Sequence, residues 1–432
     1  MTAAAPSAAA SPVGLDRARR RARLTLVAGV ALGSTGHIAA VTVATIVAKD
    51  LLGSQTLAGA PGATVVLGAA LGAVLLSALM ARRGRRIGLA TGYGIGVLGA
   101  LVATAAVITR QFPLLLLGTM LIGFGNSSNN LSRYTAADMV SPARRASAIG
   151  TVVWASTIGS VLGPWLVPLA GDFAAGIGLP PLAGPYLVPI LFVGLAGLLS
   201  FTFLRPDPYE LADAETLALA AAAGPQSIDP VREIVRRPGV AAAIVALVVG
   251  QFVMTLIMTM TPLHMTEHGH GLGAVGLVLS GHTLGMFALS PLSGRLTDRF
   301  GPIPTIFAGT AVLAVSSLMA ALAPPDGGSL LLAALFLLGF GWNLGFVAGS
   351  TLLSEHLELH ERTRIQGTAD ALIWSSAAAA SLGSGLIMAA VGYTALGILG
   401  AGAVIIPVGV LRAHRRAERH RQEHVDVEAP AL

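Results

Sequence analysis

Long apolar runs alternate with short polar connections along the whole chain. An α-helix needs about 20 apolar residues to cross the hydrocarbon core of a bilayer, and twelve runs of about that length can be drawn along the 432 residues. We predict that they form the twelve transmembrane helices of an all-α membrane protein. The predicted spans are residues 24–48, 57–80, 88–109, 113–139, 147–170, 185–204, 240–263, 273–294, 304–323, 329–354, 367–390 and 394–411.

The composition agrees with a chain that resides in lipid. Apolar residues make up 54% of it and charged residues only 11%, whereas soluble domains carry about 25% charge. The chain has no cysteine, which excludes disulfides, thiolate metal sites and thiol catalysis. The sequence also contains no nucleotide-binding loop and no set of residues that would activate a nucleophile. We therefore expect neither an enzyme nor a bound cofactor.

The basic residues indicate how the chain is oriented. The formal charge of the chain is +6, and its Lys and Arg residues lie in short clusters between apolar runs. This distribution fits the positive-inside rule rather than binding of nucleic acid. With the N-terminus inside, 25 of the 27 Lys and Arg residues lie on the cytosolic side, and only Lys49 and Arg110 lie outside. We predict a multi-pass protein of the cytoplasmic membrane, monomeric, with both termini in the cytosol.

The second half of the chain repeats the first at a distance of 217 residues. The shift aligns Arg82 with Arg299, Asp138 with Glu355, Arg145 with Arg362, and Asn126 with Asn343. Aligned charges are informative because charge is rare here. The repeat predicts two six-helix halves. The predicted parts are a disordered basic tail (1–23), an N-terminal half (24–204), a cytosolic linker (205–239), a C-terminal half (240–411) and a cytosolic tail (412–432).

A charged motif follows the eighth predicted helix. The segment Gly294-Arg295-Leu296-Thr297-Asp298-Arg299-Phe300-Gly301 resembles a loop signature of the major facilitator superfamily, which implies a transporter whose two halves rock about a central site. Charges at a helix end can pair with helix termini and with acids on neighbouring helices. We predict two gating clusters, Arg82/Asp138/Arg145 and Arg299/Glu355/Arg362, with Asp298 as a further gating residue. The alternative is that these are solvated loop charges.

Methionine and histidine are concentrated in the seventh and eighth predicted helices. Met254 and Met258 share one helix face, and so do His282 and Met286. Met254 and His282 each lie nine residues from the outer end of their span, about 13 Å deep at 1.5 Å per residue. Thioethers suit Cu(I), and imidazole binds copper or zinc. The four side chains therefore predict a copper site near the middle of the bilayer.

The two motifs also match those of a known family. Met254-Thr255-Leu256-Ile257-Met258 and His282-Thr283-Leu284-Gly285-Met286 resemble the Met-x-x-x-Met and His-x-x-x-Met motifs of the CcoA-like copper importers. The resemblance implies uptake of copper, as substrate, by alternating access. Further possible ligands are His264, His268 and His270, which would form an entrance funnel, and His37, which could instead be a proton carrier or a cavity residue.

Other interpretations remain open for these residues. Methionine in an apolar helix often serves only to fill space, and transporters related to the copper importers move riboflavin. The alternative substrate is therefore a small organic molecule, either a riboflavin-like vitamin that is taken up or a drug that is exported against protons. A membrane sensor that binds metal without moving it is a third class. The predicted cavity residues are Asn126, Gln251, Asn343, Trp154 and Trp342, and Trp374 could stack on a ring as well.

Overall fold

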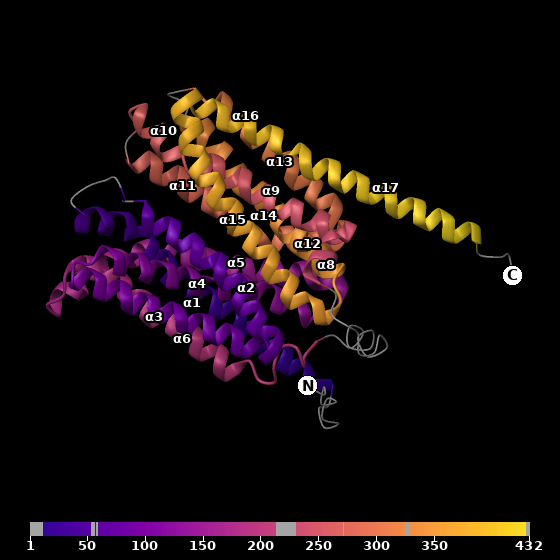
Figure 1. Cartoon of the computed structure of the whole chain (residues 1–432), viewed down its shortest axis with the longest axis horizontal. Coiled ribbons are helices and arrows are strands. Elements are labelled where there is room, and N and C mark those ends of the chain that lie inside the picture. The colour runs from indigo at the N-terminus through magenta and orange to yellow at the C-terminus, as the bar shows by residue number, and fades with distance from the viewer. Residues whose placement is uncertain are drawn as a thin grey trace.

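The computed structural model describes residues 12–52, 57, 59–212, 230–270, 272–324 and 328–428. Within these residues the chain forms helices, turns and loops and no strand. Long helices run side by side along the long axis of the molecule (Figure 1). The first half contains α1 (Pro12–Leu52), α2 (Ala60–Arg83), α3 (Arg85–Ile108), α4 (Phe112–Asp138), α5 (Arg145–Gly176) and α6 (Gly184–Phe203).

The second half begins with the short helix α8 (Val231–Arg236) and contains several broken helices. Its remaining members are α9 (Pro238–Met258), α10 (Thr261–Glu267), α11 (Leu272–Phe287), α12 (Ser290–Phe300), α13 (Pro302–Leu322), α14 (Gly328–Glu355), α15 (Leu359–Val391), α16 (Tyr393–Ala403) and α17 (Ile405–Glu428). Helices α9 and α10 together form one crossing, as do α11 with α12 and α16 with α17.

The twelve-helix prediction is confirmed. Eleven stretches of the described chain are long and apolar enough to cross a membrane. Helix α4 is the twelfth crossing, with 27 residues packed among the other helices of its half. Its polar run from Asn126 to Asn130 lowers its hydropathy, because these side chains point to protein and cavity rather than to lipid.

Two predicted spans are each interrupted by a break between two helices. Helix α9 ends at Met258 and α10 begins at Thr261, while α11 ends at Phe287 and α12 begins at Ser290. Pro262 and Pro291 stand at the starts of the second segments. Proline has no N–H and clashes with the carbonyl four residues earlier, which kinks or breaks a helix. Both breaks fall beside residues of the predicted copper site.

The N-terminal boundary differs from the prediction. Residues 12–23 were expected to belong to a disordered tail, but they are the first turns of α1. Alanine and arginine are among the best helix formers, so the Ala- and Arg-rich sequence continues the transmembrane helix outward. Residues 1–11 of the predicted tail lie outside the described residues. At the other terminus, α17 continues as a helix through the charged sequence to Glu428.

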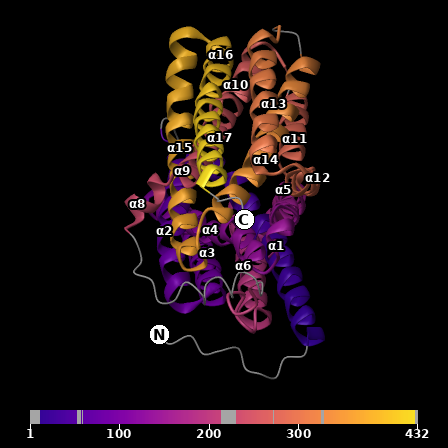
Figure 2. The same ribbon diagram turned by 90° about the vertical axis from the view of Figure 1, so that its right-hand side faces the viewer.

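The two halves meet at one end of the bundle, which we call the basic end because Arg83, Arg144 and Arg299 lie there. In Figure 1 the halves lie close together at this end and diverge toward the other, which we call the opposite end. Seen from the basic end, the C-terminal half lies above the N-terminal half (Figure 2). Small residues permit this contact. A Cβ on Gly367 of α15 would collide with Ser77 of α2, and one on Gly150 of α5 with Ser290 of α12.

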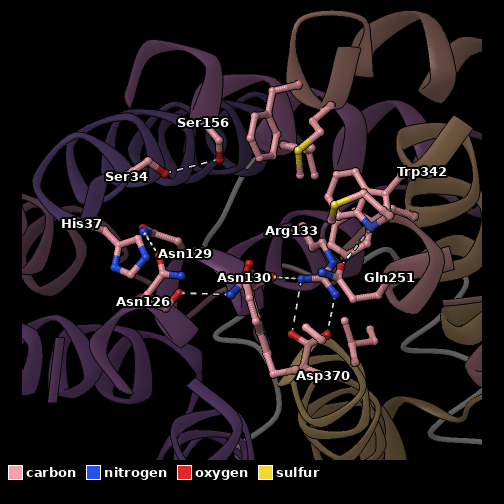
Figure 3. Close-up of a pocket in the computed structure, with 18 of the residues that line it drawn as sticks. Ser34, His37, Asn126, Asn129, Asn130, Arg133, Ser156, Gln251, Trp342 and Asp370 are labelled. Atoms are coloured by element: carbon pink, nitrogen blue, oxygen red, sulfur yellow. Dashed lines mark hydrogen bonds and ion pairs between the residues drawn. The ribbon is translucent and has the colours of Figure 1, made fainter. Parts of the chain in front are cut away.

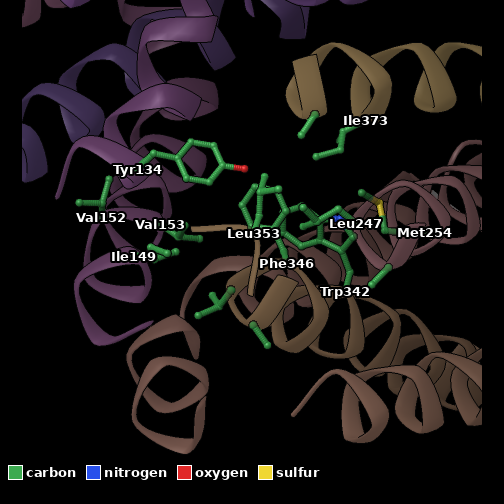
Figure 4. Packing of buried hydrophobic residues seen from close by; sticks show 14 of the residues in the cluster. Tyr134, Ile149, Val152, Val153, Leu247, Met254, Trp342, Phe346, Leu353 and Ile373 are labelled. Carbon is green, nitrogen blue, oxygen red and sulfur yellow. The ribbon is translucent and has the colours of Figure 1, made fainter. Parts of the chain in front are cut away.

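Apolar packing continues across the contact between the halves. Figure 4 shows Ile149, Val152 and Val153 of α5 facing Phe346 and Leu353 of α14. The same cluster reaches Leu247 and Met254 of α9 and Ile373 of α15. Apolar side chains of both halves thus pack against each other in this contact.

The start of the predicted linker packs against the basic end. Leu211 and Ala212 are buried, and the Arg19 guanidinium donates to both of their carbonyls, at 3.0 and 2.9 Å. Asp207 accepts hydrogen bonds from the backbone N–H groups of Arg85 and Arg86 at the start of α3. The first eight residues of the predicted linker are therefore a fixed part of the N-terminal half, whereas residues 213–229 lie outside the described residues.

Candidate substrate cavity

A cavity of about 360 Å³ lies between the two halves. Helices α1, α4 and α5 form its wall on the N-terminal side, and α9, α11, α14 and α15 form its wall on the C-terminal side. Figure 3 shows how the side chains converge on it. The principal polar and aromatic lining residues are Ser34, His37, Asn126, Asn129, Asn130, Arg133, Ser156, Gln251, Phe287, Trp342, Phe346, Asp370 and Trp374.

Three of the four residues of the predicted copper site line this cavity. Met254 and Met258 lie on one face of α9, with Met258 as its last residue. Met286 lies in the last turn of α11, next to the second helix break. The structure therefore brings the three thioethers to the same wall. Their role as metal ligands remains a prediction.

His282 is placed differently from the three methionines. Its ring is buried, with 2% of the residue exposed, and it is not part of the cavity lining. Its Nδ1 is 2.8 Å from the carbonyl oxygen of Leu335 in α14. Within the described part of the chain, its Nε2 has no hydrogen-bond partner. The ring is thus tied to α14 by one nitrogen and carries a second, unused ligand atom one helical turn from Met286.

The other histidines are separated along the molecule. His264 lies at the opposite end, where its ring stacks on Tyr393 at 4.2 Å and lies 4.4 Å from that of His268. His270 ends the turn that follows α10. Among the described residues, no three His, Cys, Asp or Glu side chains are grouped so as to hold a metal ion. His37 lines the N-terminal wall of the cavity, far along the sequence from the others.

The C-terminal wall presents an aromatic surface. The Trp342 indole stacks on Phe346, with ring centroids 4.5 Å apart and planes at 21°, and Phe287 meets it edge-on at 6.0 Å. The Trp342 N–H donates to the side-chain oxygen of Gln251 at 2.9 Å, which joins α14 to α9. Because the indole is held by stacking and by this hydrogen bond, it presents a fixed flat face to the cavity. Gln251 and Trp342 both lie where the sequence predicted.

The N-terminal wall presents amide groups. The Asn129 side chain donates to that of Asn126 at 2.8 Å and accepts a hydrogen bond from the Tyr93 hydroxyl at 2.9 Å. Asn130 and His37 complete this polar surface. The buried Nδ1 of His37 has no hydrogen-bond partner within the described residues. This side of the cavity therefore offers donors and acceptors to a ligand.

Two predicted cavity residues lie elsewhere. Trp154 of α5 is 39% exposed and is not in the lining, so it faces away from the cavity. Asn343 is fully buried behind the wall and donates to the Met286 carbonyl and the Ser290 hydroxyl, each at 2.6 Å. It also accepts a hydrogen bond from the Ser293 hydroxyl. Asn343 thus satisfies groups at the break between α11 and α12 and positions Met286 from behind.

An ion pair that sequence reasoning missed closes the cavity toward the basic end. Arg133 of α4 and Asp370 of α15 pair at 2.5 Å, and each side chain is only 2% exposed. Arg133 was counted among the loop charges of the basic end, although it lies five residues before the end of α4. A charged residue inside an apolar span is a functional candidate by default. Both residues could therefore have been picked out from the sequence as candidates for the site.

The predicted gating clusters form in a different arrangement. Asp138 pairs with Arg85 at 2.6 Å and with Arg362 of the other half at 3.5 Å, and all three are buried. Arg82 is exposed and takes no part, which corrects the predicted Arg82/Asp138/Arg145 cluster. The reason is helix direction: α2 ends at Arg83, so Arg82 points outward, while Arg85 begins α3 and turns inward.

The second cluster also crosses between the halves. The positive charges near Glu355, at the end of α14, are those of His356 and of Arg145 in the other half, and not that of Arg362. The Asp298 carboxylate accepts hydrogen bonds from the backbone N–H groups of Ala146 and Ser147, both at 3.0 Å, at the start of α5. Arg299 is exposed. The charges of one half therefore bind the other half, and their role as gates remains a prediction.

Comparison with known proteins agrees with this architecture. The chain matches the family described as Major Facilitator Superfamily over residues 24–274 and 246–430. The transporter YddS of Bacillus subtilis, described as an uncharacterized MFS-type transporter, is 37% identical over 415 residues, which cover 95% of this chain and 94% of the relative. The riboflavin transporter RfnT of Brucella anthropi is 28% identical over 382 residues, which cover 87% of this chain and 91% of the relative.

Solved structures show the same fold. The human organic anion transporter MFSD10 has a TM-score of 0.70 at 18% identity, covering 91% of this chain and 99% of its own. The transporter FucP in its outward conformation has a TM-score of 0.69 at 15% identity, covering 91% and 98%. The match to the family covers nearly all of the chain, and the helices and the central cavity agree with it. The chain therefore belongs to the major facilitator superfamily and is a multi-pass membrane transporter, not an enzyme.

Proposed function

We propose that this transporter carries a small organic molecule with a flat aromatic part and several hydrogen-bonding groups, such as a flavin. The observation that supports this most is the two-sided lining of the cavity. The Trp342 indole, backed by Phe346, offers an aromatic surface on one side, and Asn126 and Asn129 offer amides on the other. A ring system with polar edges would satisfy both.

The size of the cavity supports the same substrate class. Its volume of about 360 Å³ falls in the usual range of small-molecule pockets, about 300–1,000 Å³. A metal ion stripped of water would leave most of that space empty. The relative RfnT is a riboflavin transporter, and its similarity extends over 87% of this chain.

Riboflavin uptake tests this proposal with two matched tryptophan variants. Cells that cannot make or import riboflavin should grow on low riboflavin when they express the wild-type chain. We expect Trp342→Leu to lower uptake about fivefold, since one lost aromatic stack is worth roughly 1 kcal/mol and about 1.4 kcal/mol corresponds to a factor of ten. Trp154→Leu should transport normally, because Trp154 lies outside the cavity. Equal loss in both variants, or no uptake by the wild type, would contradict the proposal.

Copper uptake is the second candidate, and the unused Nε2 of His282 favours it. Met254, Met258 and Met286 line the cavity, and that nitrogen lies one helical turn from Met286. A modest rotation of α11 against α14 would add the imidazole to three thioethers, a ligand set that suits Cu(I).

Copper accumulation in cells distinguishes the two substrates. If copper is carried, His282→Ala and Met258→Ala should each lower accumulation severalfold, because a metal site depends on every ligand. Met265→Ala is the control, because Met265 is a buried methionine of α10 and not part of the lining. Unchanged copper accumulation in all three variants, measured at equal protein levels in the membrane, would exclude this site.

A further inference from the structure

The ion pair between Arg133 and Asp370 ties the substrate cavity to the contact between the halves. Arg133 belongs to the N-terminal half and Asp370 to the C-terminal half, and both side chains line the cavity (Figure 3). Among the described lining residues, Asp370 is the only acid. A change at this carboxylate therefore acts on substrate binding and on closure of the basic end at once.

The arginine is held independently of its partner. Arg133 donates to the Asn130 carbonyl at 2.6 Å, to the Tyr134 hydroxyl at 3.0 Å and to the Ser350 hydroxyl at 3.3 Å. Its guanidinium lies between the rings of Tyr134 and Phe346, at 4.2 and 4.3 Å from their centroids. The guanidinium can stay in place when the carboxylate leaves, so it remains available to a ligand.

The carboxylate has far fewer contacts. Asp370 receives two hydrogen bonds from Arg133, at 2.5 and 3.3 Å, and one from Tyr134 at 3.5 Å. Opening of the basic end must move α15 away from α4 and break all of them. An ionised carboxylate without a partner at this depth is strongly unfavourable, and such a group takes up a proton instead. The separation of the halves should therefore be linked to protonation of Asp370.

We propose that Asp370 is the proton-coupling residue of the transport cycle and that Arg133 takes over a substrate oxygen when Asp370 is protonated. This inference rests on the proposed function. A proton from water on the side to which the cavity is open binds to an Asp370 oxygen, and the ionic bond to Arg133 breaks. The guanidinium N–H groups then donate to a carbonyl oxygen of the substrate. After the substrate leaves on the other side, the proton returns to water there and the ion pair forms again.

The aromatic wall connects this exchange to the substrate. Phe346 contacts the Arg133 guanidinium on one face and stacks on Trp342 with the other. The guanidinium, Phe346 and Trp342 thus form one stack along the wall, and all three line the cavity that a flat substrate would occupy. One proton moves in the same direction as each substrate molecule, so that transport of a neutral substrate carries one positive charge.

The other ionisable groups on the helices around α15 are engaged or exposed elsewhere. On α4, Tyr134 faces Asp370 directly, and His37 of α1 lies across the cavity. The remaining groups lie at the ends of the bundle. At the basic end, Asp138 pairs with Arg85 and Arg362, Glu361 pairs with Arg237, Glu355 lies near Arg145, and Arg82 and Arg83 are exposed. At the opposite end, the Tyr393 hydroxyl of α16 is hydrogen-bonded to that of Thr261. None of the latter groups lines the cavity among the residues described.

Purified protein in liposomes tests the coupling with radiolabelled riboflavin. The wild type should accumulate riboflavin when a proton gradient is imposed and should lose accumulation when an uncoupler is added. Asp370→Asn should still exchange labelled for unlabelled riboflavin but should accumulate it at least tenfold less. Asp172→Asn, an exposed aspartate of α5, is the control and should accumulate normally. Accumulation by Asp370→Asn at the wild-type level, still sensitive to uncoupler, would overturn the proposal.

Two further measurements cover failure to fold and failure of the substrate assignment. If Asp370→Asn is unstable, the double variant Arg133→Gln/Asp370→Asn leaves no unpaired charge; it should exchange riboflavin more slowly, because the guanidinium is gone, and should likewise fail to accumulate it. Independently of any substrate, Ser77→Cys places the sole thiol of the chain at the closed basic end. Because maleimide reacts with the thiolate, the labelling rate at each pH is divided by that of the same thiol in the denatured chain; this ratio should rise on acidification, and Asp370→Asn should abolish that pH dependence. Persistence of the pH dependence refutes the coupling role, whereas absence of riboflavin transport in the wild type refutes only the flavin assignment.

Discussion

Gly84 and Gly301 occupy equivalent positions of the two halves, and both have backbone angles that favour glycine. Their φ values are +88° and +86°, a region that costs other residues about 1–2 kcal/mol. Their surroundings differ, however. A Cβ on Gly84 would strike the Asp207 carboxylate, which receives the N–H groups of Arg85 and Arg86, whereas one on Gly301 would meet only the edge of Pro304 at 3.8 Å.

We therefore expect Gly84→Ala to destabilise the protein more than Gly301→Ala. Both variants carry the backbone cost, but only Gly84→Ala also displaces Asp207, and the loss of a helix N-cap costs about 1 kcal/mol. Thermal unfolding of both purified variants in one detergent measures the difference. Asp207→Ala, which removes the cap without changing the backbone, should lie between the wild type and Gly84→Ala. Equal melting temperatures for the two glycine variants would show that Asp207 does not stabilise the start of α3.

At the level of single residues, the sequence predicted positions on a helix better than partners in space. Met254 and Gln251 line the cavity because helical spacing fixes which residues share a face of α9. Trp154, in contrast, faces outward. Its position was mispredicted because the spacing within α5 does not say which face of that helix meets the cavity. The pairing of Asp138 with Arg85 and Arg362 depends on how two halves approach, and no local pattern in one sequence contains that information.

Among the helices, the breaks in α9–α10 and α11–α12 set the shape of the site. Both breaks place a methionine in the last turn of a segment, and buried polar groups satisfy the backbone that the breaks free. Asn343 donates to the Met286 carbonyl, and the buried Thr261 hydroxyl donates to the Ile257 carbonyl at 2.9 Å. Hydropathy predicted the crossings but not the breaks, because Pro262 and Pro291 lie inside runs that remain apolar on average.

The contact between α12 and α5 should control opening of the basic end. Asp298 accepts two backbone hydrogen bonds at the positive end of α5, and a hydrogen bond to a charged group contributes about 1.5–3 kcal/mol. Asp298→Ala should therefore raise the population that is open at the basic end by about tenfold or more, since 1.4 kcal/mol is a factor of ten.

A single introduced thiol can report this opening, because the chain has no cysteine. Ser77 is 2% exposed and lies against Gly367 at the α2–α15 contact. In the Ser77→Cys background, Asp298→Ala should speed labelling by maleimide about tenfold, and Arg299→Ala should leave it unchanged because Arg299 is exposed. If Asp298→Ala and Arg299→Ala label at the same rate, the carboxylate does not hold the halves together.

For the molecule as a whole, the sequence repeat explains the arrangement of helices in the two halves but not the lining of the substrate cavity. Both halves supply six crossings, and of the charged residues that the shift aligned, Asp138 and Arg362 pair across the halves, whereas Arg82 and Arg299 are exposed. The cavity walls, in contrast, are unequal: amides and His37 on the N-terminal side, aromatic rings and thioethers on the C-terminal side. An asymmetric substrate would bind such a cavity in one orientation, with its polar edge toward α1 and α4 and its flat face toward α14.

The distribution of charge also fixes how the whole molecule should sit in the membrane. Exposed Arg82 and Arg83 end α2 at the basic end, whereas His268 follows α10 at the opposite end. By the positive-inside rule we expect the basic end to face the cytosol. A membrane-impermeant maleimide should therefore label His268→Cys in intact cells, and it should label Arg83→Cys only after the cells are permeabilised. The reverse pattern would place the cavity opening on the other side of the membrane. It would also reverse the direction in which protons and substrate move together.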